Sequence, residues 1–399
     1  MRPELGWAWL SQTERRAAEQ ALIDAGPDGT RDELGFSVIH FAYSDRFFPG
    51  TSVQQTSLRY VWFVCWSYLE LQQRWPGGVF PEQELANIED RTGRRLLTHY
   101  DFEEGKGIIG SRVLRAGRTP VVRPSAIYWN AMRLWGLIAQ RDHERPGRGE
   151  VHARWDEWTS RRPRPEVDAE TTAALFDNAP LPPRHWSSEK TPLSFEFDHS
   201  QGEGARIRRA WALLRDPFNQ PTLLSRLAER RAEAPSQLTA PEVLDVCSSG
   251  AEQESLHRAS DAGAVAGIAR ALHTHMVQNK KDATGRLAAD TRRWVDEAVL
   301  NYAEAARRLD LTSLLYEVPE ARRLLQLMQA TQNWLAAGAG GVEALEPIYR
   351  LREMNQKPGR ALLAPDAGDR RNAWKPRVMG PLTYRWDRVA AFLDELVGS

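Results

Sequence analysis

The 399-residue sequence contains only two cysteines, Cys65 and Cys247, and no long apolar run. Two cysteines cannot build a disulfide framework or a zinc-binding set, which fits a reducing compartment. A membrane helix needs about 20 apolar residues in succession, and the N-terminal residues lack the apolar core and small-residue cleavage site of a secretion signal. These absences predict a soluble, cytoplasmic protein that does not enter a membrane.

The sequence also lacks the common motifs of nucleotide, zinc and nucleophile chemistry. It has no GxxxxGK[ST] phosphate loop, no GxGxxG after a predicted strand, no HExxH and no GxSxG. The duplicated HxK motif of phospholipase-D-like enzymes is missing as well. Nine scattered histidines without cysteine partners do not predict a zinc site. We therefore expect no cofactor and no bound metal, and a protein that is not an enzyme by itself.

Net charge is zero, with 53 basic and 53 acidic residues, but the charges are unevenly distributed. Residues 1–90 hold 7 basic and 13 acidic residues, a net charge of −6, whereas residues 91–164 hold 16 and 8, a net charge of +8. The remaining residues hold 30 and 32, a net charge of −2. The basic block can bind a polyanion, or it can pair with the acidic N-terminal block of the same chain.

Tryptophan is frequent, with 15 residues. Trp62 and Trp66 are four residues apart, and Trp155 and Trp158 are three apart, so that each pair falls on one face of a helix. Because a tryptophan side chain buries a large apolar area, we predict that most of them lie in a core or a domain interface. Stacking on nucleic-acid bases is the alternative.

Apolar residues recur at helical spacing along most of the sequence, without the alternating strands and helices of a parallel sheet. We predict a mainly α fold, with a helical N-terminal domain over residues 1–150 and a helical-bundle C-terminal domain over residues 191–399. Residues 151–190 are rich in Arg and Pro and are predicted to be a linker. A buried helix is expected over about 53–75, and a single strand over 192–198.

Arg59 directly precedes the apolar run "YVWFVCW" (60–66). A charge that is buried there without a partner costs several kcal/mol. We therefore predict a structural ion pair between Arg59 and Asp45, with Asp32 or Glu33 as alternative partners.

Five segments, in order along nearly the whole chain, carry a family likeness: "TRDELG" (30–35), "DRFFPGTSVQQTSLRYVWFVCW" (45–66), "GIIGSR" (107–112), "PSAIYWNAMRLWG" (124–136) and "LTYRWDRVAAFLDEL" (382–396). With these segments the sequence resembles the bacterial domain-of-unknown-function family 6361. The resemblance implies no established activity and no catalytic residues. It implies a partner-dependent role, because members of the family look like genomic companions of helicase-like and phospholipase-D-like proteins in phage-defence neighbourhoods.

One group of residues has the order found in cation-dependent nucleases. Such a site needs clustered carboxylates to hold the cation and a lysine to polarise the attacking water. Asp90, Glu104 and Lys106 occur in this order. A nuclease would also need Asp90 at the end of a strand, whereas the sequence around it predicts a helix that ends at Gly93.

The sequence favours an accessory, non-enzymatic subunit of a bacterial defence-type complex. We expect it to contact DNA or RNA, or a helicase-like or phospholipase-D-like protein, through the basic block. Cations spaced along one loop suit phosphate contacts, which give affinity without sequence specificity. The expected nucleic-acid contacts are Lys106, Arg112, Arg115, Arg118 and Arg123. The alternatives are the cation-dependent nuclease and a scaffold that binds only proteins.

Overall fold

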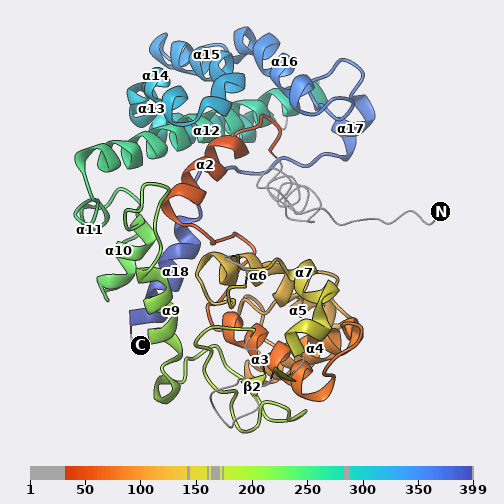
Figure 1. The fold of residues 1–399 in the computed structure, drawn as a ribbon. Helices are drawn as coiled ribbons and strands as arrows, with labels where there is room; N and C mark the ends of the chain where they lie inside the picture. Colours follow the sequence, from red (N-terminus) through yellow and green to blue (C-terminus); the bar gives the residue numbers. More distant parts are fainter. Residues whose placement is uncertain are drawn as a thin grey trace, which may run out of the picture. The chain divides into compact units, whose positions relative to one another are not determined.

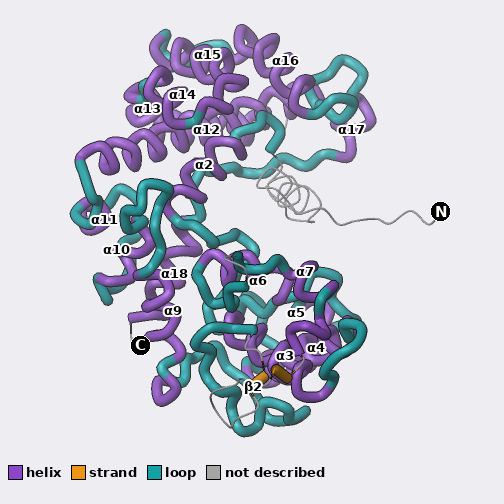
Figure 2. The backbone as a smooth tube through the Cα atoms, in the orientation of Figure 1, coloured by secondary structure: helices purple, strands orange, loops and turns teal. Residues whose placement is uncertain are grey.

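A computed structural model describes residues 32–141, 144–159, 161–162, 171–172, 175–282 and 288–397. Within these residues the fold is mainly α-helical, as predicted, with 17 α-helices (Figure 1). The strands in this part of the chain are β1 (Arg161–Arg162) and β2 (Thr171–Thr172), which pair antiparallel over two residues each (Figure 2).

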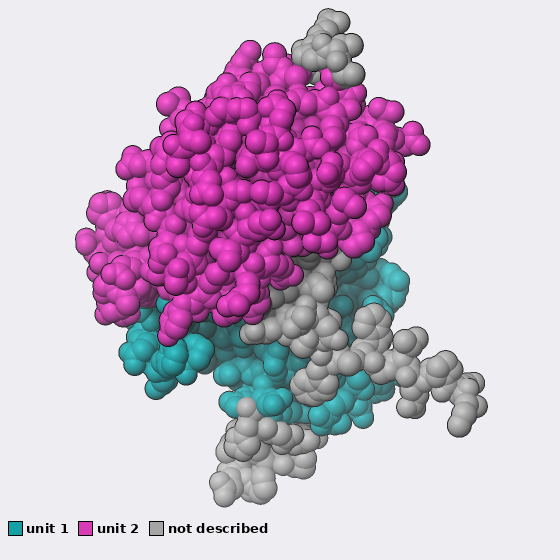
Figure 3. Space-filling view, turned by 90° about the horizontal axis from the view of Figure 1, so that it is seen from above, with its two compact units in different colours: residues 1–9, 45–236, 385–399 teal, residues 10–44, 237–384 magenta. Residues whose placement is uncertain are grey.

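The described chain forms two compact units, coloured separately in Figure 3. They consist of residues 45–236 with 385–397 (unit 1) and residues 32–44 with 237–384 (unit 2). Each unit combines stretches that are distant in the sequence, whereas the prediction places a domain over 1–150, a linker over 151–190 and a domain over 191–399. The described residues of that linker belong to unit 1.

Unit 1 is built around α3 (Tyr60–Arg74). Its other helices are α4 (Glu82–His99), α5 (Ser111–Arg115), α6 (Pro124–Leu134), α7 (Arg148–Ala153), α8 (Trp155–Thr159), η1 (His199–Gln201), α9 (Glu203–Ala212), α10 (Leu223–Glu229) and α18 (Trp386–Val397). Helix α18 comes from the C-terminal end of the chain and packs beside α9 and α10 (Figure 1).

Helix α3 is buried on nearly all sides, as expected for a helix that is apolar all round. Trp62 and Trp66 are completely buried on it, and Trp155 and Trp158 are almost completely buried on α8. The prediction that these pairs lie in a core is therefore confirmed. Their burial leaves these four indole rings unavailable for stacking on bases.

The segment before α3 is a turn, so the helix begins at Tyr60 and not near residue 53 as predicted. The side chain of Gln55 holds this turn: its Oε1 accepts a hydrogen bond from the amide of Ser52 at 3.0 Å, and its Nε2 donates to the carbonyl of Gly50 at 3.1 Å. These side-chain bonds satisfy backbone groups that helical hydrogen bonds would otherwise pair, so the helix does not extend into this segment.

Helix α4 continues through Gly93 to His99, where the sequence predicts an end at Gly93. Glycine inside a helix costs about 1 kcal/mol relative to alanine. Here it permits close packing, because a Cβ on Gly93 would lie 2.5 Å from Cδ1 of Leu114 on α5. Gly93 is thus the contact point between α4 and α5.

The strand predicted over 192–198 is absent, and the segment is irregular. Its backbone amides bond to α4 and the residue after it: Leu193 N donates to the carbonyl of Arg95 at 3.4 Å, and Phe195 N donates to the hydroxyl of Tyr100 at 2.9 Å. The alternating apolar residues therefore cover the end of a helix and do not pair with another strand.

Unit 2 is built around α12 (Gly250–Lys281), which is buried over most of its length. Its other helices are α11 (Pro241–Leu244), α13 (Ala288–Arg308), α14 (Leu311–Glu317), η2 (Pro319–Leu324), α15 (Leu325–Ala336), η3 (Val342–Leu345), α16 (Glu346–Gln356) and α17 (Gly368–Ala373). Helix α2 (Ser37–Phe47) begins in this unit and ends with the first residues of unit 1.

Two glycines one turn apart on α12 let the segment 380–382 lie directly against the helix. A Cβ on Gly263 would lie 2.9 Å from the carbonyl oxygen of Leu382, and a Cβ on Gly267 would lie 3.2 Å from Cα of Pro381. Both neighbours are backbone atoms. At Gly263 the close approach requires a residue without a side chain, and at Gly267 a Cβ fits only if the neighbouring backbone shifts by a few tenths of an ångström.

Candidate functional site

The candidate interface is the segment 100–118, which follows α4 and includes α5; we call it the basic loop. Arg115 of α5 fastens its two halves together, because its guanidinium donates to the carbonyl of Glu103 and lies 3.4 Å from Oε1 of Glu104. Leu114 packs on Gly93 from the other side of α5. Glu103 and Glu104 therefore lie beside α5.

Two of the predicted phosphate contacts, Arg112 and Arg118, are exposed on this loop. Within the described residues, neither has a carboxylate within ion-pairing distance. An exposed guanidinium of this kind is available to a phosphate group without first breaking a contact within the protein.

Two further predicted contacts form weak ion pairs within the loop. Lys106 Nζ lies 2.8 Å from Glu103 Oε2, with 42% and 59% of the two side chains exposed. Arg115 pairs with Glu104, whose side chain is 94% exposed. Exposed pairs contribute only about 0–1 kcal/mol, so a phosphate can replace either carboxylate at small cost.

The fifth predicted contact, Arg123, follows the basic loop in the sequence, and its side chain is only 18% exposed. Its Nη1 donates to Oδ1 of Asp90 at 2.8 Å and to the carbonyl of Ala86 at 3.0 Å. The other oxygen of Asp90 accepts a hydrogen bond from Thr119 Oγ1 at 2.9 Å. Arg123 is therefore the counter-ion of a buried carboxylate and fastens the start of α6 to α4.

These contacts also bear on the nuclease hypothesis. Asp90 lies inside α4 and is occupied by Arg123, Glu104 lies on the exposed loop, and Lys106 pairs with Glu103. In the described part of the chain, no three His, Cys, Asp or Glu side chains gather closely enough to hold a metal ion. Asp90, Glu104 and Lys106 therefore do not form the cluster that a cation-dependent nuclease site requires.

An aromatic residue that the sequence reasoning overlooked lies on the basic loop. Phe102 is 55% exposed, and its backbone and that of Asp101 adopt left-handed conformations, with φ of +58° and +46°. Such conformations are unfavourable outside glycine and occur at turns and functional sites. The amide of Phe102 donates to the carbonyl of Leu97 at 2.8 Å, which fixes the turn at the end of α4.

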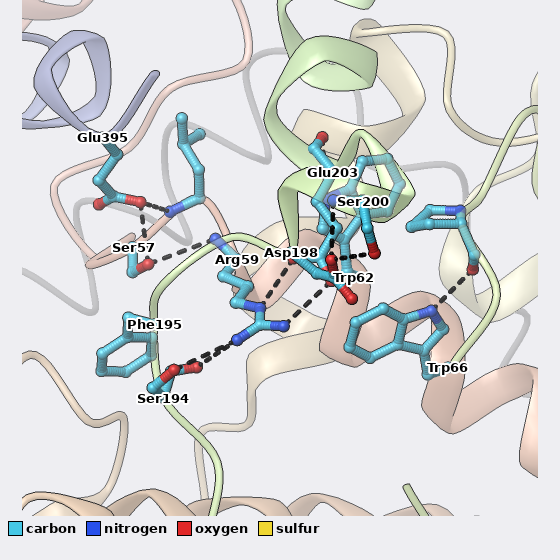
Figure 4. A network of polar contacts seen from close by, with 12 residues as sticks. Ser57, Arg59, Trp62, Trp66, Ser194, Phe195, Asp198, Ser200, Glu203 and Glu395 are labelled. Atoms are coloured by element: carbon cyan, nitrogen blue, oxygen red, sulfur yellow. Dashed lines mark hydrogen bonds and ion pairs between the residues drawn. The ribbon is translucent and has the colours of Figure 1, made fainter. Parts of the chain in front are cut away.

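Arg59 is the centre of a buried polar network in unit 1 (Figure 4). Its Nε and Nη2 bond to the two carboxylate oxygens of Glu203 at 2.8 and 3.0 Å, and its Nη1 donates to the carbonyl of Ser194 at 3.0 Å. The indole N–H of Trp62 donates to the backbone carbonyl of Glu203 at 3.2 Å. The network holds α3 to α9 and to the irregular segment before α9, and each nitrogen of the Arg59 guanidinium donates at least one hydrogen bond.

The predicted ion pair between Asp45 and Arg59 is therefore replaced by two other pairs. Asp45 lies 3.0 Å from Nη1 of Arg385, near the start of α18, whereas Arg59 pairs with Glu203. The alternative partners are also engaged elsewhere: Asp32 accepts the amides at the start of α2, and Glu33 pairs with a lysine on the loop after α16.

A second carboxylate in Figure 4, Glu395 of α18, lies half-buried beside the start of α3. Its Oε2 accepts hydrogen bonds from Ser57 Oγ at 3.0 Å and from the amide of Leu58 at 2.8 Å. Burial raises the pKa of Glu395 to about 7, against the smaller lowering effect of these hydrogen bonds. This group changes its charge in the physiological pH range.

Residues 3–173 match the model of a family of unknown function (DUF6361). The matched residues include the basic loop, and the match confirms the resemblance seen in the sequence over this part of the chain. No curated protein and no solved structure matches. Among the described helices, none is both long and apolar enough to cross a membrane.

Proposed function

We propose that this chain, whose residues 3–173 belong to a family of unknown function (DUF6361), is a non-enzymatic accessory subunit of a bacterial defence-type complex. In this proposal the basic loop contacts single-stranded nucleic acid. The observation that carries it is the exposed aromatic ring of Phe102 on the same loop as the exposed cations Arg112 and Arg118.

The chemistry of the loop fits a single strand better than a duplex. Phosphate contacts by Lys and Arg supply affinity and release counterions, and unpaired bases stack on exposed aromatic side chains. Phe102 offers such a face, while Lys106 and Arg115 add cations whose present partners are exposed carboxylates. Three carboxylates in the same loop, Asp101, Glu103 and Glu104, keep its net charge low, which favours a short contact over a long electrostatic track.

The accessory role includes a protein partner of the helicase-like or phospholipase-D-like kind, which the family resemblance implies. Asp90 supports a non-enzymatic role. Its carboxylate is paired with Arg123, whereas the nuclease alternative needs this carboxylate to hold a cation. Purification of the tagged chain from its native cell identifies the companion. If the chain elutes alone under gentle conditions, the accessory role is contradicted.

The nucleic-acid contact is tested by reversing the two exposed charges together. We expect Arg112→Glu with Arg118→Glu to weaken binding of a short fluorescent single-stranded oligonucleotide at least about tenfold at low salt, measured by fluorescence anisotropy with DNA and with RNA. The matched control is Arg322→Glu with Arg323→Glu on η2 of unit 2, which reverses two exposed charges elsewhere. Equal affinity of the loop variant and the unchanged chain would contradict the proposal.

A further inference from the structure

A pocket of about 200 Å³ lies within unit 1, away from the basic loop. It is bounded by the end of α6, by residues 177–178 and by the outer face of α9. The side chains that matter for its chemistry are the exposed Leu134 at the end of α6 and Leu213 after α9, the cations Arg145, Arg206 and Arg209, and the carboxylate Asp177.

One wall of the pocket is apolar and rigid. Helix α6 ends in a Schellman motif, in which the amide of Gly136 donates to the carbonyl of Arg133 at 3.3 Å and that of Leu137 donates to Met132 at 2.8 Å. Gly136 takes the left-handed conformation that this motif requires, with φ of +74°. The motif gives two carbonyls at the negative end of the helix a hydrogen-bond donor. This wall therefore repels an anion less than a helix end with unpaired carbonyls would.

Two of the three cations are fixed in place by the backbone. Arg145 donates from Nε to the carbonyl of Ile138 at 3.0 Å, and its guanidinium lies close to the bare Cα of Gly136. Arg206 donates to the carbonyls of Asn178 at 2.8 Å and Gln201 at 3.2 Å. In both cases these neutral carbonyl acceptors hold the guanidinium without cancelling its positive charge.

The third cation, Arg209, is exposed one turn along α9 from Arg206. Within the described residues it has no ion pair, and neither does Asp177 on the facing segment. Three cations against one carboxylate leave the pocket lining with a net charge of +2. Arg145 and Arg206 are half-buried, so water screens their charges less than at an open surface. A lining of this charge attracts an anionic ligand.

We infer that this pocket binds a small phosphomonoester: a phosphate dianion held by Arg206 and Arg209, with an apolar or ring-shaped group against the exposed side chains of Leu134 and Leu213. The guanidinium fork matches the geometry of phosphate oxygens. The two negative charges of the phosphate match the net charge of the lining. A cavity of about 150 Å³ suffices for a benzene ring, so the pocket has room for a ring or a comparable group beside the phosphate.

The phosphomonoester can be a free metabolite or the 5′-phosphate of a nucleic acid, and the same chemistry recognises both. This inference does not rest on the proposed function, because the pocket and the basic loop share no residue. Arg112→Ala removes a cation of the basic loop and leaves the pocket intact, and Arg209→Ala does the reverse.

The test is isothermal titration calorimetry of the full chain with phenyl phosphate, and with inorganic phosphate and benzoate for comparison. We expect phenyl phosphate to bind more tightly than either, and Arg209→Ala to weaken it about tenfold or more. Asp177→Asn should strengthen binding, since it removes a negative charge that faces the ligand. Arg112→Ala should leave it unchanged.

A 5′-phosphorylated oligonucleotide and the same strand without the phosphate distinguish the two sources of the ligand. A 5′-phosphate preference that disappears in Arg209→Ala points to a nucleic-acid end, whereas binding of phenyl phosphate alone points to a free metabolite. Absence of phenyl phosphate binding, or binding that Arg209→Ala and Asp177→Asn leave unaltered, would overturn the inference.

Discussion

Arg59 and Glu203, which are 144 residues apart in the sequence, form a two-bonded ion pair inside unit 1. The side chains are 8% and 1% exposed, so water screens the pair only weakly. A buried ion pair adds little compared with apolar residues of the same shape, but the loss of one partner leaves an uncompensated charge. The pair therefore fixes which surfaces of α3 and α9 meet.

The first prediction concerns this pair. Arg59→Met should lower the free energy of unfolding by about 3–5 kcal/mol, because Glu203 then remains buried without its counter-ion. The double variant Arg59→Met with Glu203→Leu should recover a large part of that loss. Urea denaturation of both variants, followed by circular dichroism, measures the difference.

A matched control for this prediction is Arg292→Met on α13, whose partner Asp296 is more than half exposed. Its effect should stay below about 1 kcal/mol. If the double variant is no more stable than Arg59→Met alone, the coupling between the two side chains is disproved.

The second prediction concerns pH. The pKa of Glu395 rises from 4.5 to about 7 because the group is buried. Between these values the folded chain retains a proton that the unfolded chain has released, so the free energy of unfolding falls as the pH rises. The stability associated with Glu395 is complete below pH 4.5 and is lost above about pH 7.

Glu395→Gln tests this assignment, because the amide oxygen still accepts from Ser57 and Leu58 while the charge is gone. We expect the variant to be more stable than the unchanged chain at pH 8, by on the order of 1–3 kcal/mol, and little different at pH 5. Thermal unfolding at both pH values measures this. An equal shift at both pH values would contradict the titration of Glu395.

The third prediction concerns the glycines of α12. Gly263→Ala should destabilise unit 2 by about 1–3 kcal/mol, because the new methyl group meets the backbone carbonyl of Leu382 at 2.9 Å and a backbone atom cannot rotate away. Gly250→Ala at the start of the same helix has no neighbour within 4 Å. That variant should be neutral or slightly stabilising in the same denaturation experiment.

The helical class and much of the core could be predicted from the sequence, because both depend on local spacing. Trp62 and Trp66 are four residues apart on an apolar helix, which already indicates their burial. The partner of Arg59 could not be predicted, because the packing of α9 on α3 brings Glu203 to it from a distant part of the sequence. Asp45 is much closer in the sequence, but it pairs with Arg385.

The candidate interface was predicted in part. The charge excess located the basic loop, but spacing alone could not separate Arg123, which Asp90 neutralises, from the exposed Arg112 and Arg118. Phe102 was overlooked because an aromatic residue at the end of a helix is usually part of the core. Phe102 is exposed because it and Asp101 both adopt a left-handed backbone conformation. Neither residue is a glycine, so the sequence does not predict this conformation.

The last prediction separates the electrostatic and stacking contributions of the basic loop. Arg112→Gln with Arg118→Gln should reduce the slope of log K against log salt by about 0.7 for each phosphate of a single strand that the variant no longer neutralises. Phe102→Ala should instead lower the affinity by about 1–3 kcal/mol and leave the slope unchanged, because stacking releases no counterions. Phe102→Tyr keeps an aromatic face and should retain most of the affinity. Anisotropy titrations at several salt concentrations distinguish these outcomes, and a reduced slope in Phe102→Ala would show that the ring acts by holding the cations in place.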